Sequence, residues 1–144
     1  MHIVCEHCSS TNRIPEGKTH VGAKCGKCGK AIYSGRPVDL NDSNFYRYVE
    51  NNHMPVIVDF WASWCKPCRK SFPWMNNMQA KYPDDLQVIA INLDAEPELA
   101  AAFLDKVPAH MPIVYDPQGN IAKAYKLLGM PSSYLIDKKG NIRF

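Results

Sequence analysis

The chain has 144 residues and a mass of 16.3 kDa, room for one ordinary domain or one compact domain with a small appendage. Hydrophobic residues make up 46% of the sequence and charged residues 22%, so neither disorder nor a fibrous repeat is expected. The net charge is +3, and the apolar runs are far shorter than the ~18 residues of a membrane-spanning helix. We therefore expect a soluble protein without a membrane partner.

The first 36 residues differ in composition from the rest of the chain. They are rich in Cys, Gly, Lys and Ser and have almost no aliphatic periodicity, so buried apolar area alone cannot fold them. After a boundary near Gly35-Arg36-Pro37, apolar strands alternate with amphipathic helices. The sequence therefore predicts a small module over residues 1–36 and a core-forming α/β domain over residues 37–144.

Within the larger part, predicted strands and helices follow one another in regular alternation. The predicted strands cover residues 38–40, 55–61, 86–93, 112–115 and 132–137, with a final piece over 142–144. The predicted helices cover residues 44–51, 65–82, 96–104 and 120–127. The strand before Ala62 is predicted to be central because both of its faces are apolar apart from Asp59, and Pro73 predicts a kink in the longest helix. This alternation predicts a sheet covered by helices on both faces.

Six cysteines form three Cys-x-x-Cys pairs, and two of these pairs lie in the first module. Cys5 and Cys8 are separated from Cys25 and Cys28 by sixteen residues, which fits the spacing of four-thiolate zinc sites. We therefore predict one structural Zn²⁺ per chain and no organic cofactor, with zinc binding supplying the folding free energy that this core-poor module lacks. Two structural disulfides are the alternative, which the absence of a visible secretory signal disfavours. A cytoplasmic location is the default expectation.

Other residues of the first module are given simpler interpretations. His2, His7 and His20 could replace cysteines as ligands, but four cysteines already fill a tetrahedral shell, so we interpret them as solvated loop residues. The module has six cations and two acids, a net +4 that zinc with four thiolates lowers to about +2. Tyr33 is its only aromatic residue, so we do not expect a nucleic-acid partner and interpret the lysines as a solvated face.

The third pair, Cys65 and Cys68, lies where the central strand ends and a helix begins. Cys65 is predicted at the helix N-terminus, where unpaired backbone N–H groups and the macrodipole stabilise a thiolate. Cys68 lies one turn deeper, so Cys65 can attack a substrate disulfide and Cys68 can then resolve the mixed disulfide. Pro67 suits the first helical turn because its missing N–H would have no partner there. A third zinc knuckle is the alternative, but no fourth Cys-x-x-Cys pair completes it.

Two charged residues have predicted roles beside this pair. Asp59, on a strand with two apolar faces, is predicted to be at least partly buried with a raised pKa, so that it takes the proton from Cys68. A carboxylate that reaches solvent at the strand end is the alternative. Lys66 places a cation beside the attacking sulfur, which favours the thiolate and shifts the couple toward oxidant behaviour. An ordinary exposed lysine is the alternative.

The segment from Trp61 to Cys68, Trp-Ala-Ser-Trp-Cys-Lys-Pro-Cys, resembles the active-site signature of the thioredoxin superfamily. Residues 1–62 resemble the zinc-ribbon bacterial thioredoxins called thioredoxin-2, and the chain from about residue 63 resembles the TlpA/ResA thiol-disulfide oxidoreductases. The resemblance implies a thioredoxin-like α/β fold, a central mixed sheet flanked by helices, behind a zinc ribbon. It implies electron transport to protein disulfide substrates, with thioredoxin reductase as the usual electron donor.

The resemblance also implies a substrate-binding set. Pro131 corresponds to a cis-proline that faces the active-site cysteines, and Met130 and Trp64 line the groove for an extended substrate segment, together with Lys66 and Pro67 between the cysteines. Typical thioredoxins have Gly in place of Lys66, so their strongly reducing potential does not carry over. The family pattern continues through a final strand and a carboxy-terminal helix, which the domain over residues 37–144 is predicted to lack.

These observations predict a cytoplasmic protein-disulfide oxidoreductase with a zinc ribbon in front. Cys65 attacks, Cys68 resolves and Asp59 assists the proton transfer. The contrasting hypothesis is a zinc-dependent binding or chaperone module whose thioredoxin-like domain is catalytically idle.

Overall fold

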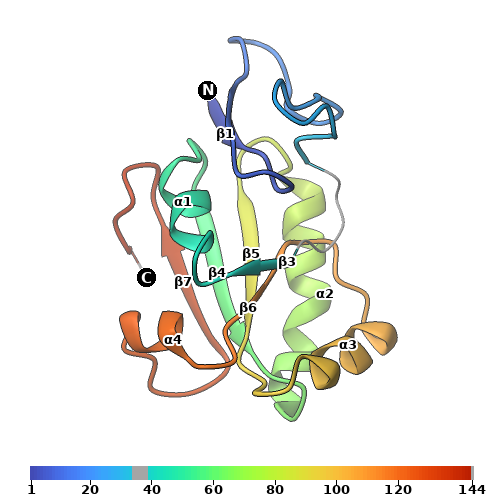
Figure 1. The fold of residues 1–144 in the computed structure, drawn as a ribbon. Helices are drawn as coiled ribbons and strands as arrows, with labels where there is room; N and C mark the ends of the chain where they lie inside the picture. Colours follow the sequence, from blue (N-terminus) through green and yellow to red (C-terminus); the bar gives the residue numbers. More distant parts are fainter. Residues whose placement is uncertain (34–38, 144) are drawn as a thin grey trace.

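The computed structural model describes residues 1–33 and 39–143, so the predicted boundary at Gly35-Arg36-Pro37 lies outside the described residues. The elements in chain order are β1 (His2–Val4), β2 (Thr11–Arg13), β3 (Asp39–Asn41), α1 (Phe45–Glu50), β4 (Val56–Trp61), α2 (Lys66–Lys81), β5 (Gln87–Asn92), α3 (Pro97–Lys106), β6 (Ile113–Tyr115), α4 (Asn120–Ala124) and β7 (Ser132–Ile136). Figure 1 shows the first two strands at one end of a sheet with helices on both sides. None of the described helices is long and apolar enough to cross a bilayer.

The main sheet has five strands in the order β3-β6-β5-β4-β7, and it is mixed. The first four strands run parallel, and β7 pairs antiparallel with β4. Val56 of β4 lies opposite both Gln87 of β5 and Ile136 of β7, so the strand is paired on both edges. Pairing on both edges and side chains that are buried except for a half-buried Ile57 confirm that this strand lies inside the sheet, as its two apolar faces predict.

Helices cover both faces of the sheet, and each face has its own hydrophobic core. On one face, Phe72 of α2 and Phe103 of α3 pack with Trp61. On the other face, Phe45 of α1 and Ile121 of α4 pack with alternate residues of β4 and β5. The sequence pattern predicts this arrangement, and the α/β fold class is confirmed.

Several predicted element ends differ from the structure. The helix α2 runs without interruption through Pro73, and Cys65 and Tyr82 cap it rather than belong to it. The helix α4 ends at Ala124, three residues before its predicted end, because Lys126 has a left-handed backbone with φ 53°. At the end of the chain Ile142 forms an antiparallel bridge with β7, whereas Phe144, like Val38, lies outside the described residues.

The first module contains a strand pair and a small apolar cluster that the sequence analysis did not predict. It contains an antiparallel hairpin of β1 and β2, which sequence periodicity missed because each strand is only three residues long. Ile3, Ile14 and Ile32 pack together with Met54, which precedes β4. The His53 amide donates to the His2 carbonyl at 3.0 Å, so the module is joined to the start of β4.

Candidate active site and metal centre

Cys65 and Cys68 form a disulfide bond at the start of α2, with their Cα atoms 5.3 Å apart. Cys65 is the N-cap of the helix, and the Cys68 backbone N–H donates to its Sγ at 3.3 Å. Pro67 occupies the first turn, where a backbone N–H would have no acceptor. The sulfur of Cys65 therefore lies among helix N-terminal N–H groups, which stabilise a thiolate there when the bond is reduced.

The two cysteines differ in access to solvent. Cys68 is fully buried, whereas Cys65 is 5% exposed and directly follows Trp64, whose side chain is 68% exposed. The first tryptophan of the motif, Trp61, is instead buried, with its ring centroid 4.9 Å from that of Phe72. Cys65 is thus the less buried of the two cysteines, which is the order that an attacking and a resolving thiol require.

A buried polar network, which the sequence analysis missed, holds the loop before Cys65. The Asp94 carboxylate accepts hydrogen bonds from the Ser63 backbone N–H at 2.9 Å and from the Ser63 hydroxyl at 2.8 Å. The Asn92 side-chain amide donates to the same carboxylate at 2.7 Å. Their position could have indicated this role, since polar residues at or just after the C-terminal end of a buried parallel strand lie where ligand-facing loops gather.

Asp59 is 1% exposed, and alternation along β4 places it on the same face as Trp61, toward α2. Its Oδ1 accepts a hydrogen bond from the Ser133 hydroxyl of β7, while Oδ2 has no partner among the described residues. Burial raises the pKa of this carboxyl from 3.8 to about 6, with the Ser133 hydrogen bond acting in the opposite sense. The predicted burial and raised pKa are confirmed, and the proton-accepting role stays a prediction.

This burial predicts a pH-dependent difference in stability between the parent and Asp59→Asn. The folded state holds the Asp59 proton up to about pH 6, whereas the unfolded chain releases it near pH 3.8, so the parent loses stability as the pH rises through that window. Between pH 4.5 and pH 8 we expect the free energy of unfolding of the variant to rise by about 2 kcal/mol relative to that of the parent. Urea unfolding of both oxidised proteins measures this, and a pH-independent difference would contradict it.

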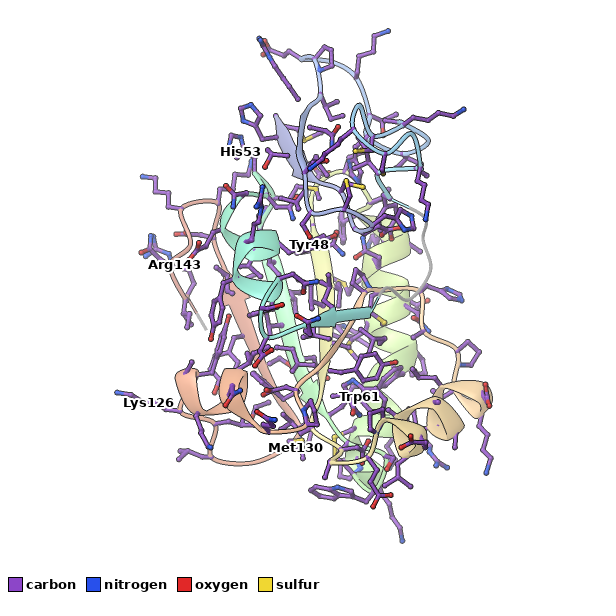
Figure 2. All side chains as sticks on the ribbon, in the orientation of Figure 1. Tyr48, His53, Trp61, Lys126, Met130 and Arg143 are labelled. Atoms are coloured by element: carbon purple, nitrogen blue, oxygen red, sulfur yellow. A yellow bond between two sulfur atoms is a disulfide. The ribbon has the colours of Figure 1, made fainter. Side chains whose placement is uncertain are left out.

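The Met130–Pro131 peptide bond is cis and lies directly before β7, whose first residue, Ser132, pairs with Phe60 near the end of β4. Figure 2 labels Met130 and Trp61 at the end of the molecule that is opposite to His53. The end of β4, which leads to the active-site cysteines, and the residue before the cis-proline therefore lie at one end of the sheet. Lys66 and Pro67 are exposed and Met130 is half-buried, and the role of each in substrate binding stays a prediction.

The other four cysteines lie together at the opposite end of β4. Their sulfur atoms all lie within 4.8 Å of one another. The sulfurs of Cys5 and Cys28 are 3.7 Å apart, as are those of Cys8 and Cys25. Four sulfurs at ~2.3 Å from a tetrahedral ion are ~3.8 Å apart along each edge, so these residues can hold one Zn²⁺.

The two knuckles of this cluster, the turns that hold Cys5 with Cys8 and Cys25 with Cys28, have the same backbone conformation. The residue after each second cysteine has a left-handed backbone, with φ 55° at Ser9 and 73° at Gly29. Its N–H donates to the carbonyl of the first cysteine, at 2.9 Å in one knuckle and 2.8 Å in the other. This repeated turn directs both thiolates of each pair toward one point, as the two-residue spacer predicts.

The left-handed turn predicts unequal effects of alanine at two neighbouring glycines. Gly29→Ala should destabilise the zinc-loaded ribbon by about 1 kcal/mol, because only the backbone conformation opposes a Cβ there, with no atom within 4 Å. Gly26→Ala is the matched control, since its backbone is not left-handed and its Cβ would meet Asn12 Oδ1 at 3.8 Å. Competition with a chelator measures both effects, and equal zinc retention would contradict this account of the turn.

Hydrogen bonds and burial shift the pKa values of two thiols of the cluster in opposite directions. The hydroxyl of Ser10, with further donors, lowers the pKa of Cys25 to about 5, so this sulfur is a thiolate at neutral pH. Burial raises the pKa of Cys5 to about 12. Without a cation the cluster therefore holds fewer than four thiolates, and a bound divalent ion would stabilise the remainder.

One interpretation of the histidines was wrong. His20 is not a solvated loop residue: it is 1% exposed, and its Nδ1 lies 3.1 Å from Asp84 Oδ1, beyond α2. The Thr19 hydroxyl donates to the same carboxylate. These contacts form a second junction between the ribbon and the main sheet domain. Nothing in the local sequence of His20 indicates its partner, which lies more than sixty residues away along the chain.

Comparison with known proteins identifies both parts of the chain. A model of the AhpC/TSA family matches residues 33–144, well over half of the chain. The chain belongs to the AhpC/TSA family. A second model, described as the N-terminal part of thioredoxin 2, matches residues 4–30, the segment that holds the four clustered cysteines. This AhpC/TSA member thus begins with a zinc-ribbon module, as the cysteine spacing predicts.

Several relatives of this AhpC/TSA member are thiol-disulfide oxidoreductases by name. Thioredoxin C-3 of Corynebacterium nephridii is 39% identical over 103 residues, 72% of this chain and 70% of its own length. ResA of Bacillus thuringiensis subsp. konkukian is 35% identical, over 88% of this chain and 69% of its own. A candidate thiol:disulfide interchange protein DsbE of Chlorobium tepidum superposes with a TM-score of 0.63 at 50% identity, over 64% of this chain and 66% of that one. The chain is a thioredoxin-like protein-disulfide oxidoreductase.

Proposed function

We propose that this chain reduces protein disulfides through its Cys-Lys-Pro-Cys site. The observation that carries this proposal is the disulfide of Cys65 and Cys68 at the N-terminus of α2, with Cys65 at the helix cap and Cys68 fully buried. Trp64, Lys66 and Pro67 would contact the substrate beside this sulfur. Met130 and Pro131, at the same end of the sheet, would receive its extended backbone.

The reaction begins with the reduced protein. The Cys65 thiolate attacks one sulfur of the substrate disulfide, forms a mixed disulfide and releases the first substrate thiolate. The Cys68 thiol then gives up its proton and attacks the Cys65 sulfur, which releases the second substrate thiolate and leaves the Cys65–Cys68 disulfide. Two electrons pass from the protein to the substrate, the Cys68 proton goes to a base in the protein, and the two released substrate thiolates take up protons from solvent.

Asp59 is the proposed acceptor of the Cys68 proton. A carboxyl with a pKa of about 6 is mostly ionised at neutral pH and can still be reprotonated readily, which suits a general base. Asp59→Asn should slow resolution of the mixed disulfide by about 10²-fold without abolishing attack by Cys65. Rapid-quench measurement of the two steps tests this assignment, which unchanged resolution kinetics would refute.

We also propose a division of the chain into a zinc ribbon over residues 1–36 and a thioredoxin-like domain over residues 37–144. One Zn²⁺ held by Cys5, Cys8, Cys25 and Cys28 would stabilise the ribbon, as their tetrahedral spacing supports. A cytoplasmic location fits four free thiols, because oxidising compartments favour disulfides. Thioredoxin reductase is the proposed donor that reduces the Cys65–Cys68 bond after each turnover.

The test of this function is the reduction of insulin disulfides with dithiothreitol as the reductant. The parent should accelerate the reaction above the uncatalysed rate, and Cys65→Ser should return it to that rate. A catalytically idle binding module, the contrasting hypothesis, would show no acceleration in the parent. Replacing dithiothreitol with NADPH and thioredoxin reductase tests the proposed donor, since NADPH consumption should then require both insulin and this chain.

A further inference from the structure

The active-site helix α2 carries cations and no acidic residue. Among its 16 residues are Lys66, Arg69 and Lys70 at the start and Lys81 at the end, with no Asp or Glu between them. The side chains of Lys66, Arg69 and Lys70, here called the basic patch, are all exposed. Three positive charges therefore lie within the first five residues of a helix whose N-terminus already has a positive partial charge.

Helical spacing places this patch next to the reactive sulfur. Lys66 directly follows the capping Cys65 and Arg69 directly follows Cys68, while Lys70 lies four residues after Lys66 on a neighbouring position of the helix surface. The Arg69 guanidinium lies over the Phe103 ring, 5.4 Å from its centroid. This contact holds one charge on the α3 side of the cysteines rather than leaving it free to turn away.

The charges of the patch are not neutralised within the protein. In the described part of the chain, the only ion pairs of an Arg or Lys with a carboxylate involve Arg143. The neighbouring helix α3 has exposed carboxylates, Glu98 among them, but none lies within ion-pair distance of the patch. The positive potential of the patch is thus available to a molecule that approaches Cys65.

We propose that the basic patch selects disulfide substrates in which Asp or Glu residues flank the reactive cysteine. This inference rests on the proposed function and adds a substrate class to it. Complementary charge would speed the encounter of an acidic segment with Cys65, and like charge would slow that of a basic segment. The effect would be strong at low salt and weak once the Debye length falls to a few ångströms.

Three substrates test the proposal with the reduced full-length protein. Two are peptides with the same intramolecular disulfide, flanked by Glu in one and by Lys in the other, and the third is the neutral 2-hydroxyethyl disulfide. We expect the acidic peptide to react about tenfold faster than the basic peptide at low salt. At high salt the rates of the two peptides should agree within about twofold. Equal rates for the two peptides at low salt would overturn the proposal.

Charge reversal within the helix locates the effect. The double variant Arg69→Glu/Lys70→Glu should invert the peptide preference, whereas Lys81→Glu, ~18 Å along the same helix from Arg69, should leave it unchanged. A general change in thiolate reactivity would change the reaction rates of all three substrates by the same factor. The ratio of the two peptide rates therefore reports only the effect of charge on docking. An unaltered ratio in the double variant overturns the proposal. Should this variant fail to fold, the salt dependence of the ratio of peptide rates in the parent still tests the proposal.

The neutral disulfide distinguishes failure of the proposed substrate class from failure of the proposed function. A parent that reduces it without distinguishing the peptides retains the proposed function and loses the substrate class. A parent that reduces none of the three disulfides loses the proposed function, and the substrate class with it.

Discussion

Removal of the metal from the four-cysteine cluster is expected to unfold the ribbon while the main sheet stays folded. Structural zinc contributes about 10 kcal/mol or more to small modules of this kind. The apolar cluster of Ile3, Ile14 and Ile32 is small, so the ribbon has little buried apolar surface to hold it together without the ion. The five-stranded sheet has two hydrophobic cores, to which the ribbon contributes only Val4, so we expect the sheet to stay folded without the ion.

Hydrogen exchange measures this effect by region. After chelation, amides in residues 1–33 should lose protection, whereas those of β4 and β5 should keep it. Cys28→Ser should reproduce the loss without a chelator, and Lys30→Ser, two residues away and exposed, is the matched control that should retain both zinc and protection. A ribbon that stays protected without metal would show that its hairpin and apolar contacts suffice.

Cys68→Ser is expected to convert the protein from a catalyst into a trap. Cys65 still attacks, because its thiolate is stabilised by the helix N-terminus, but the mixed disulfide is not resolved. Turnover should fall to the background rate while about one substrate molecule becomes bound to each protein molecule. Mass spectrometry under non-reducing conditions measures the adduct.

The matched variant in this experiment is Cys65→Ser, which keeps Cys68. Because Cys68 is fully buried, this variant should form no adduct with a protein disulfide. Equal adduct formation by the two variants would show that the burial difference does not set their roles.

The sequence predicted what depends on short-range pattern. Apolar alternation at Val56, Val58 and Phe60 was sufficient to place β4 inside the sheet, and two-residue spacers were sufficient to group the cysteines. The buried carboxyl at Asp59 followed from the same alternation. In each case the physical cause lies within a few residues of the feature it explains.

Features that depend on distant contacts were missed or wrong. The burial of His20 depends on Asp84, and the position of the Cys65 loop depends on Asp94, both far away in the sequence.

Two local features were also missed. The hairpin of β1 and β2 was missed because three-residue strands have too few alternating positions to show a period. The early end of α4 reflects the backbone of Lys126, which its residue type does not favour.

The central claim is that six cysteines divide by place into a metal set and a redox set. It is tested most directly by counting the zinc bound to the folded protein, and then its thiols after denaturation, before and after reaction with one equivalent of a disulfide substrate. The account predicts one zinc throughout, with the thiol count falling from six to four. Zinc loss that accompanies this oxidation, with Cys65 and Cys68 still reduced, would contradict it.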